Sequence, residues 1–483
     1  MFDIVVRGGT VVTDGAERVA DVGIRDGRIA ALGEGLAGER ELDARGTLVL
    51  PGGTDPHVHL AYPQGPARVV SADDWETGTI AAACGGTTTV IDFVEARADE
   101  TWMAALAARR AEAEAAAAID FGLHMTFHRT DPRSLAEVPE VIAAGVPSFK
   151  FYMAYDGLRL DDGELLAGFE ALAAHGGLAL VHAENHDVIR HLVAHHRRAG
   201  HTHAAFHPLC HPATGEAEAT ERALALCAIA GNPVHVVHVS AEAGLAALAR
   251  ARDGGQAATG EVCPQHLVLT DAVYAGADAD LFAMAPPLRR DSDREALWAA
   301  LRDGGLDFVV TDHCPFTRAQ RRGQRRTPEF RRTPAGVQPT AAEEPWSPTP
   351  PSFDRLPGGG AGIETRMALV HHYGVGAGRL SPARFVELTS TAAARRFGLY
   401  PRKGTLAPGA DADVVLFDRE REVTISAGRL HQNVDHTPFE GLTVRGWPRT
   451  VLSRGELLVH DFEWVGSAGR GRFLSRGPVA GLA

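Results

Sequence analysis

Residues 47–59 read TLVLPGGTDPHVH, an apolar run that passes two glycines and ends in two histidines. Alternate side chains of an extended strand point to the same side, so the imidazoles of His57 and His59 would reach a common point. Two imidazoles on one side can bind one metal ion. Such a pair alone is a weak signal, and the rest of the chain decides what it means.

Four further apolar runs also end in residues of the kinds found in metal sites. They are 148–154 (SFKFYMA) with Lys150, 178–185 (LALVHAEN) with His182, 234–240 (VHVVHVS) with His238, and 307–314 (DFVVTDHC) with Asp312. One chance pair is ordinary, whereas five strand ends that each carry such a residue indicate a shared site.

The order of the apolar runs predicts an α/β fold, a TIM (β/α)8 barrel. Eight short runs alternate with Ala-rich helical stretches, several of which end in the glycine typical of a helix C-terminus. Eight such units favour a closed barrel over an open sheet. A barrel of this kind carries its chemistry at the carboxyl ends of its strands, where the candidate ligands lie.

Both ends of the chain differ from this middle part in their pattern of apolar and turn residues. Residues 1–53 read as short strands with Gly and Asp turns, and residues 405–465 show the same pattern. We therefore expect the two segments to form one small β-sandwich domain. The barrel would span 54–404, with 466–483 as a tail. Within the barrel, the Arg- and Pro-rich insertion 317–351 is interpreted as a mobile surface loop, with a lid over the site as the alternative.

Composition excludes several classes of protein. The chain has 483 residues, 45% hydrophobic content and a net charge of −13, which argues against a nucleic-acid binder. No apolar run reaches the roughly 18 residues that span a membrane, and no signal peptide is recognisable at the start. The five cysteines are scattered and odd in number, which favours reduced thiols and a cytoplasmic location.

Lys150 is the unusual member of the candidate set. An ammonium group beside two divalent cations would be repelled, so the lysine must be neutral or chemically altered. A set of His-x-His, Lys, His, His and Asp over eight βα units resembles the amidohydrolase superfamily. The resemblance implies two divalent ions, Zn²⁺ with Mn²⁺ as the alternative, and a lysine carbamylated by carbon dioxide (N6-carboxylysine) that bridges them. The implied ligands are His57, His59 and Asp312 for one ion, His182 and His238 for the other, and Lys150 for both.

Several motifs resemble the hydantoinase and dihydropyrimidinase branch of that superfamily. They are FKFYMAYDG (149–157), GEVCPQHLVLT (260–270), MAPPLRRDSDREALW (284–298), TDHCPF (311–316), GAGIETR (360–366), KGTLAPGADADVVLFD (403–418) and QNVDHTPFEGLTVRGWP (432–448). The branch implies ring opening of dihydropyrimidines or 5-substituted hydantoins to N-carbamoyl amino acids by a homotetramer. Asp312 would transfer the proton, and the Tyr155 hydroxyl would stabilise the oxyanion. The expected partner is thus a small cyclic diamide, with no nucleic acid and no membrane.

The resemblance also implies positions that bind the substrate. Ala285 and Gly358 stand where the branch usually has Ser and Asn, and both contacts would be made mainly by backbone groups. Ala61 stands where a dihydroorotase-like relative would need an arginine for a substrate carboxylate, which favours a ring without one. The bulky residues expected to line a pocket for the ring substituent, with ordinary packing as the alternative, are Leu60, Tyr62, Phe151 and Tyr152.

Three alternatives remain open from the sequence. An allantoinase-like hydrolase would use the same ligands, and a non-catalytic scaffold would keep the fold but lose them. The histidine-rich run 191–211 could suggest a further metal site, but no spacing in it matches a closed tetrahedral site. Cys314 lies near Asp312 but has no partner base in the sequence, so packing is its default interpretation.

Overall fold

The computed structural model describes residues 1–13, 15–64, 69–322 and 351–478, and the backbone alone of 330–333 and 336–339. Within these residues no helix is both long and apolar enough to cross a membrane.

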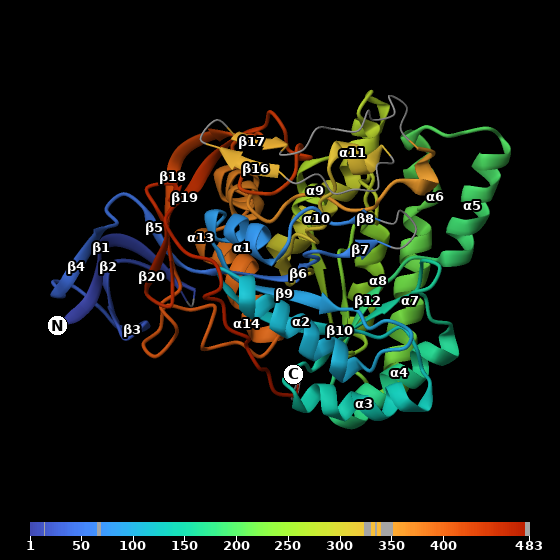
Figure 1. The fold of residues 1–483 in the computed structure, drawn as a ribbon, viewed down its shortest axis with the longest axis horizontal. Helices are drawn as coiled ribbons and strands as arrows, with labels where there is room; N and C mark the ends of the chain where they lie inside the picture. The colour runs from blue at the N-terminus through green and yellow to red at the C-terminus, as the bar shows by residue number, and fades with distance from the viewer. Residues whose placement is uncertain (14, 65–68, 323–329, 334–335, 340–350, 479–483) are drawn as a thin grey trace.

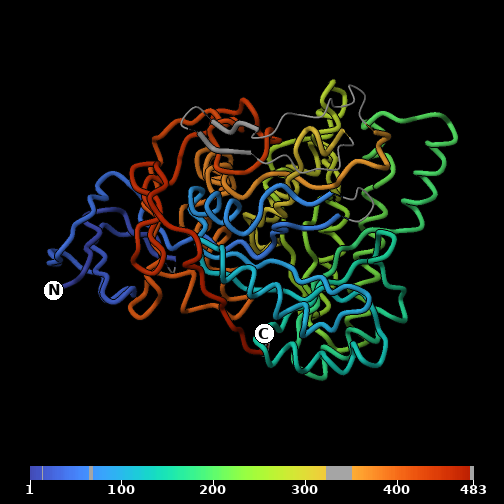
Figure 2. The backbone as a smooth tube through the Cα atoms, viewed as in Figure 1, coloured from blue at the N-terminus to red at the C-terminus, as the bar shows by residue number. Residues whose placement is uncertain are grey.

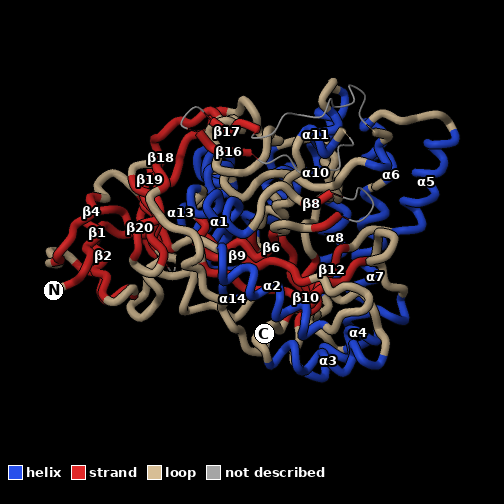
Figure 3. Tube along the Cα trace, viewed as in Figure 1, coloured by secondary structure: helices blue, strands red, loops and turns tan. Residues whose placement is uncertain are grey.

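Eight parallel strands form the centre of the molecule, and the prediction of a TIM barrel is confirmed (Figures 1 and 3). In chain order they are β6 (Gly53–Val58), β9 (Thr87–Val94), β10 (Asp120–Thr126), β11 (Ser148–Tyr152), β12 (Leu178–His182), β13 (Val234–Val236), β14 (Ala258–Val262) and β15 (Phe308–Val309). Each strand pairs with the next along the chain. A parallel bridge between Val58 and His313 joins the last strand to the first and closes the ring.

Helices surround the strands and connect them (Figure 3). The connecting helices are α1 (Trp75–Cys84), α2 (Trp102–Ala116), α3 (Pro132–Ala143), α4 (Asp162–His175), α5 (His186–Arg198), α6 (His207–Cys210), α7 (Ala213–Ala230), α8 (Glu242–Asp253), α9 (Pro264–Val268) and α10 (Asp291–Asp303). After the last strand follow α11 (Arg318–Arg321), α12 (Arg366–Val370), α13 (Pro382–Val386) and α14 (Ala392–Arg396).

Local sequence signals set where these helices begin and end. Asp161 caps α4, its side chain accepting from the backbone N–H of Glu164 while the Glu164 carboxylate accepts from the backbone of Asp161. This reciprocal capping satisfies two N–H groups that the helix leaves free. The same helix ends at Gly176, whose φ of 71° suits glycine.

One sheet of nine strands is built from both ends of the chain, so the predicted terminal β domain is confirmed (Figure 2). Its strands are β1 (Phe2–Thr13), β2 (Ala16–Arg25), β3 (Arg28–Gly33), β4 (Gly38–Asp43), β5 (Leu48–Pro51), β18 (Val414–Thr424), β19 (Thr443–Ser453), β20 (Glu456–His460) and β21 (Glu463–Trp464). Strand β5 pairs on one side with β1 and on the other with β18. We retain domain boundaries near residues 53 and 405 as a proposal.

A buried lysine connects the two parts of the molecule. Lys403 is 1% exposed, and its Nζ lies 2.7 Å from the Asp120 carboxylate at the start of β10. The same Nζ lies 2.8 Å from Asp413 and 3.1 Å from Asp411, which precede β18. This ammonium group therefore links the barrel to the terminal sheet, together with the Arg454 guanidinium, which also pairs with Asp120.

The predicted tail packs against the start of the barrel strands. The backbone of Leu474 bonds to Phe121, and that of Arg476 bonds to Gly145. The buried Arg476 guanidinium donates to the Ser148 hydroxyl at 3.0 Å and to the carbonyl of Leu123. The tail thus covers the end of the barrel opposite the carboxyl ends of the strands.

The insertion 317–351 is more structured than the loop that we expected. It begins with α11 and contains a hairpin of β16 (Phe330–Thr333) and β17 (Gly336–Pro339). Its other segments, 323–329, 334–335 and 340–350, lie outside the described residues.

Candidate active site

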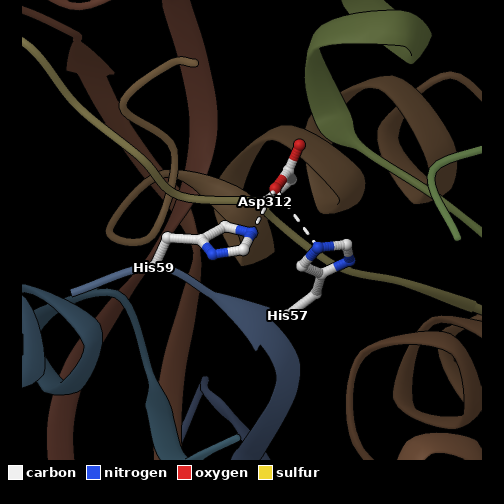
Figure 4. A group of neighbouring side chains, drawn as sticks. All are labelled: His57, His59 and Asp312. Carbon is white, nitrogen blue, oxygen red and sulfur yellow. Dashed lines mark ion pairs between the residues drawn. The ribbon is translucent and has the colours of Figure 1, made fainter. Parts of the chain in front are cut away.

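His57 in β6 and His59 just after that strand face the end of the last barrel strand. His57 Nε2 lies 3.2 Å from Asp312 Oδ1, and His59 Nε2 lies 3.1 Å from the same oxygen (Figure 4). One ligand atom from each of the three residues falls within 4.8 Å of the other two, as a common metal ion would require. The alternation of side chains along β6 produces this pair, as predicted.

A second pair of histidines lies beside the first. His182, the last residue of β12, places Nδ1 at 2.9 Å from Nε2 of His238, which follows β13. The ring centroids of His57 and His238 are 5.6 Å apart, so the two pairs are neighbours. The four imidazoles can serve two ions side by side.

Lys150 extends into the barrel between these groups. Its Nζ lies 3.3 Å from His57 Nε2, and the residue is 1% exposed. Burial lowers the pKa of Lys150 to about 8, although the carboxylates of Asp312 and Glu261 act to raise it. A neutral amine is the form that can add carbon dioxide, so the environment suits the bridging carbamate.

His57 and His238 are held in the form that binds metal. Burial lowers the pKa of His57 and of His238 well below the usual histidine value, so both rings are neutral. Nδ1 of His59 and Nδ1 of His238 are buried with no hydrogen-bond partner among the described residues. Buried imidazoles, the Asp312 carboxylate and a lysine whose pKa is lowered fit a pair of divalent cations.

Two buried glutamates behind the histidines were not identified from the sequence. Glu261 Oε1 lies 2.5 Å from His57 Nδ1, and the other oxygen lies 2.9 Å from His235. Glu184 Oε2 lies 2.9 Å from His182 Nε2, while Oε1 lies 2.8 Å from His211 Nδ1. Such carboxylates orient ligand imidazoles. An acidic residue within an apolar run, as in GEV and VHAEN, is the signal that could have indicated both.

A family profile and whole-chain relatives match this chain. The profile described as the amidohydrolase family covers residues 48–458. The chain belongs to the amidohydrolase family. A D-hydantoinase of Streptomyces coelicolor is 41% identical over 98% of this chain and 97% of its own length.

Solved structures agree with this placement. The structure of D-hydantoinase from a Bacillus sp. AR9 has a TM-score of 0.91 at 39% identity, covering 99% of this chain and all of its own. That of dihydropyrimidinase from Brevibacillus agri NCHU1002 has a TM-score of 0.91 at 38% identity, covering 99% of both chains. The prediction of an enzyme in the hydantoinase branch of the amidohydrolases is confirmed.

Several site residues of this amidohydrolase have a strained backbone. Tyr155, His238 and Asp312 have φ values of 77°, 36° and 50°, in the left-handed region that side-chain-bearing residues rarely adopt. Each such residue costs about 1–3 kcal/mol and persists where the surroundings enforce it. The strain coincides with positions predicted for catalysis and metal binding.

The Tyr155 side chain lies at the His182 side of the site. Its hydroxyl donates to Glu184 Oε2 at 3.2 Å, and its ring centroid is 5.0 Å from that of His182. Burial, together with the Glu184 carboxylate, raises the pKa of Tyr155 well above its usual value. The hydroxyl therefore stays protonated and able to donate.

The two loops expected to hold the substrate are fastened together. The backbone N–H of Gly359 donates to the carbonyl of Ala283 at 3.1 Å, which joins the loop of Gly358 to that of Ala285. The buried guanidinium of Arg321 donates to the carbonyls of Ala283 and Pro357, both at 3.1 Å. The first turn of the insertion thus braces both loops.

Both backbone groups of Gly358 are engaged by one side chain. The Gly358 N–H donates to Gln64 Oε1 at 2.9 Å, and Gln64 Nε2 donates to the Gly358 carbonyl at 2.8 Å. A cyclic amide presents the same neighbouring donor and acceptor. Gln64 therefore occupies the groups that the resemblance assigns to the substrate.

The four expected pocket residues separate into two pairs. Phe151 packs in the core, its ring 4.6 Å from Phe127 and 4.8 Å from Phe169 on α4, so it does not face the site. Leu60 is also fully buried and packs against Gly78 of α1. The other two stay near the ligands: Tyr62 lies 4.9 Å from the His59 ring, and Tyr152 lies 5.7 Å from that of His182.

The histidines of the run 191–211 make separate contacts with different partners. His196 and His201 are joined Nδ1 to Nδ1 at 3.0 Å, and His207 Nε2 lies 2.8 Å from the carbonyl of Met284. His211 binds Glu184, as described above. The run thus reaches the site through one residue that supports a ligand.

Proposed function

We propose that the enzyme is a binuclear metal-dependent cyclic amidase that opens dihydropyrimidines or 5-substituted hydantoins to N-carbamoyl amino acids. The observation that carries the proposal is the placement of buried Lys150 beside His57, between the pair His57 and His59 and the pair His182 and His238. A carbamate on this lysine would offer one oxygen to each pair. The names of the relatives support the substrate class.

The residues of the chain then have distinct roles. Two bound divalent ions, Zn²⁺ or Mn²⁺, would polarise the scissile carbonyl and activate water. Asp312, within 3.2 Å of both His57 and His59, accepts the proton of the attacking water and returns it to the leaving nitrogen. The Tyr155 hydroxyl donates to the developing oxyanion. Glu261 and Glu184 hold His57 and His182 in place, and the backbones of Ala285 and Gly358 hold the ring.

The decisive test is ring opening by the purified enzyme loaded with zinc or manganese in the presence of bicarbonate. The panel contains dihydrouracil, several 5-substituted hydantoins, allantoin and dihydroorotate. Turnover of dihydrouracil or the hydantoins supports the proposal, whereas turnover of allantoin alone identifies an allantoinase-like enzyme. No turnover with no metal bound would favour the scaffold.

We further propose a homotetramer that works in the cytoplasm with carbon dioxide as the modifying agent. All five cysteines are buried and none forms a disulfide, which supports a reducing compartment. Light scattering of the purified protein measures the assembly, and the mass of a tryptic peptide that contains Lys150 measures the carbamate.

Replacing Tyr155 with phenylalanine is expected to lower kcat by about 10²–10³-fold, because one donor to the oxyanion is lost. Metal content should stay at the wild-type level, since the hydroxyl reaches Glu184 rather than a ligand. Steady-state kinetics and elemental analysis measure the two quantities. Wild-type kcat in Tyr155→Phe would refute this role.

Replacing Gln64 with leucine is expected to lower KM for hydantoins by about tenfold, because substrate no longer has to displace two hydrogen bonds from Gly358. Gln64→Glu keeps the acceptor but loses the donor, so an intermediate KM is expected. A raised KM in Gln64→Leu would mean that the amide binds the substrate instead of competing with it.

A further inference from the structure

Glu95 lies at the mouth of the barrel on the side that faces the ligands. In β9, Ile91 and Phe93 belong to the cluster inside the barrel, whereas Val94 packs in the outer core and Asp92 bonds to Arg109 of α2. Because side chains alternate along a strand, residue 95 continues the inward row. The next inward residue below it, Phe93, stacks on His59 with ring centroids 4.6 Å apart.

The Glu95 carboxyl has charged neighbours but makes no direct ion pair among the described residues. It hydrogen-bonds Tyr62 and lies within electrostatic reach of His59, Arg109, Tyr152 and Lys150. Its Oε1 is buried without a hydrogen-bond partner among the described residues, and no ion pair to Glu95 occurs in that part of the chain. Burial raises the pKa of Glu95 to about 7, and the opposing effects of His59, Tyr62 and Arg109 offset this only in part.

The position of Glu95 makes the expected pocket for the ring substituent more polar than its predicted apolar lining suggested. Leu60 and Phe151, its two purely apolar candidates, face the core, and the residues that remain near the ligands are the phenols Tyr62 and Tyr152. Tyr62 hydrogen-bonds Glu95, and Tyr152 lies within its electrostatic reach. The pocket is therefore polar and acidic.

We propose that Glu95 determines specificity, and that the enzyme prefers cyclic amides whose ring substituent ends in a cation or a hydrogen-bond donor. The inference rests on the proposed ring-opening function and names the substrate class within it. A donor from the substituent would satisfy Glu95 Oε1, and an ammonium or guanidinium group would also supply the missing charge partner. A carboxylate on the substituent would be repelled.

The test compares matched hydantoins on the metal-loaded enzyme. The 5-substituents are 4-aminobutyl, n-butyl and 2-carboxyethyl, which differ in the charge at the end of the chain. The wild type should favour aminobutyl over butyl in kcat/KM by about 10–100-fold and should turn over carboxyethyl least. This ranking needs no variant, so it tests the proposal even if substitutions at Glu95 impair folding.

The variant Glu95→Gln keeps the shape and removes the charge. The aminobutyl-to-butyl ratio should fall at least tenfold, and the carboxyethyl substrate should gain relative to butyl. Tyr62→Phe, which keeps the carboxylate, should retain the aminobutyl preference. A ratio near one in the wild type, or an unchanged ratio in Glu95→Gln, would overturn the proposal. Absence of turnover on every ring would instead refute the proposed function.

Discussion

Lys150→Ala is expected to lose activity by on the order of 10³-fold or more and to bind less than half of the wild-type metal. The physical reason is that Lys150 is placed beside His57 and between two histidine pairs, where its carbamate would be the one ligand common to both ions. Its loss leaves each ion one ligand short in a buried site. Elemental analysis and hydantoin turnover measure the two effects.

Two comparisons separate the loss of the bridge from loss of folding. Short carboxylates such as formate or propionate can enter the space that alanine leaves and supply two oxygens, so they should restore part of the activity. Lys150→Arg keeps a positive charge but cannot form the carbamate, and it should be inactive with or without added carboxylate. A Lys150→Ala enzyme with two metals and more than a tenth of wild-type activity would contradict the bridging role.

Lys403→Met is expected to lower the free energy of unfolding by about 3–5 kcal/mol, because buried Asp413 loses its cation and Asp120 keeps only its pair with Arg454. Asp120 and Asp413 lie within 2.8 Å of its ammonium group, and the lysine is 1% exposed. Urea denaturation followed by circular dichroism measures the change.

Arg402→Met is the matched control. Arg402 lies next to Lys403 in the chain and binds Asp411 at 2.9 Å, but its side chain is 43% exposed. A solvated pair of this kind contributes about 1 kcal/mol or less. Equal losses in the two variants would show that Lys403 does not have the special role described here.

Much of the fold could be predicted because its determinants are local. Period-two alternation and apolar runs indicated all eight barrel strands, and the glycines indicated several helix ends. The residues brought together as ligands, such as His57 and His238, were predicted because each follows a strand and a barrel gathers its strand ends at one face.

The errors concern the side chains that were expected to line the pocket. Their directions depend on the alternation of side chains along a strand. Lys150 points into the barrel, so Phe149 and Phe151 must point outward, and the expectation for Phe151 ignored that alternation. Leu60 follows the end of β6, where the chain turns toward α1, and no periodic rule applies there.

Other features could not be read from the sequence because they depend on distant contacts. The pairing of Gln64 with Gly358 and the bracing by Arg321 join loops that are far apart in the chain. The sequence contains the donors and acceptors but not their separation. The partial order of the insertion has the same origin, since Arg321 is buried only when those loops are in place.

The pairing of β5 with β18 has a consequence for synthesis on the ribosome. Pro51 is paired with Val414, so β5 has an unprotected edge until most of the chain has been made. At about 5–20 residues per second this interval lasts on the order of a minute. An open apolar edge invites pairing with other nascent chains. We therefore expect truncated products that end before β18 to aggregate in the cell and to require chaperones.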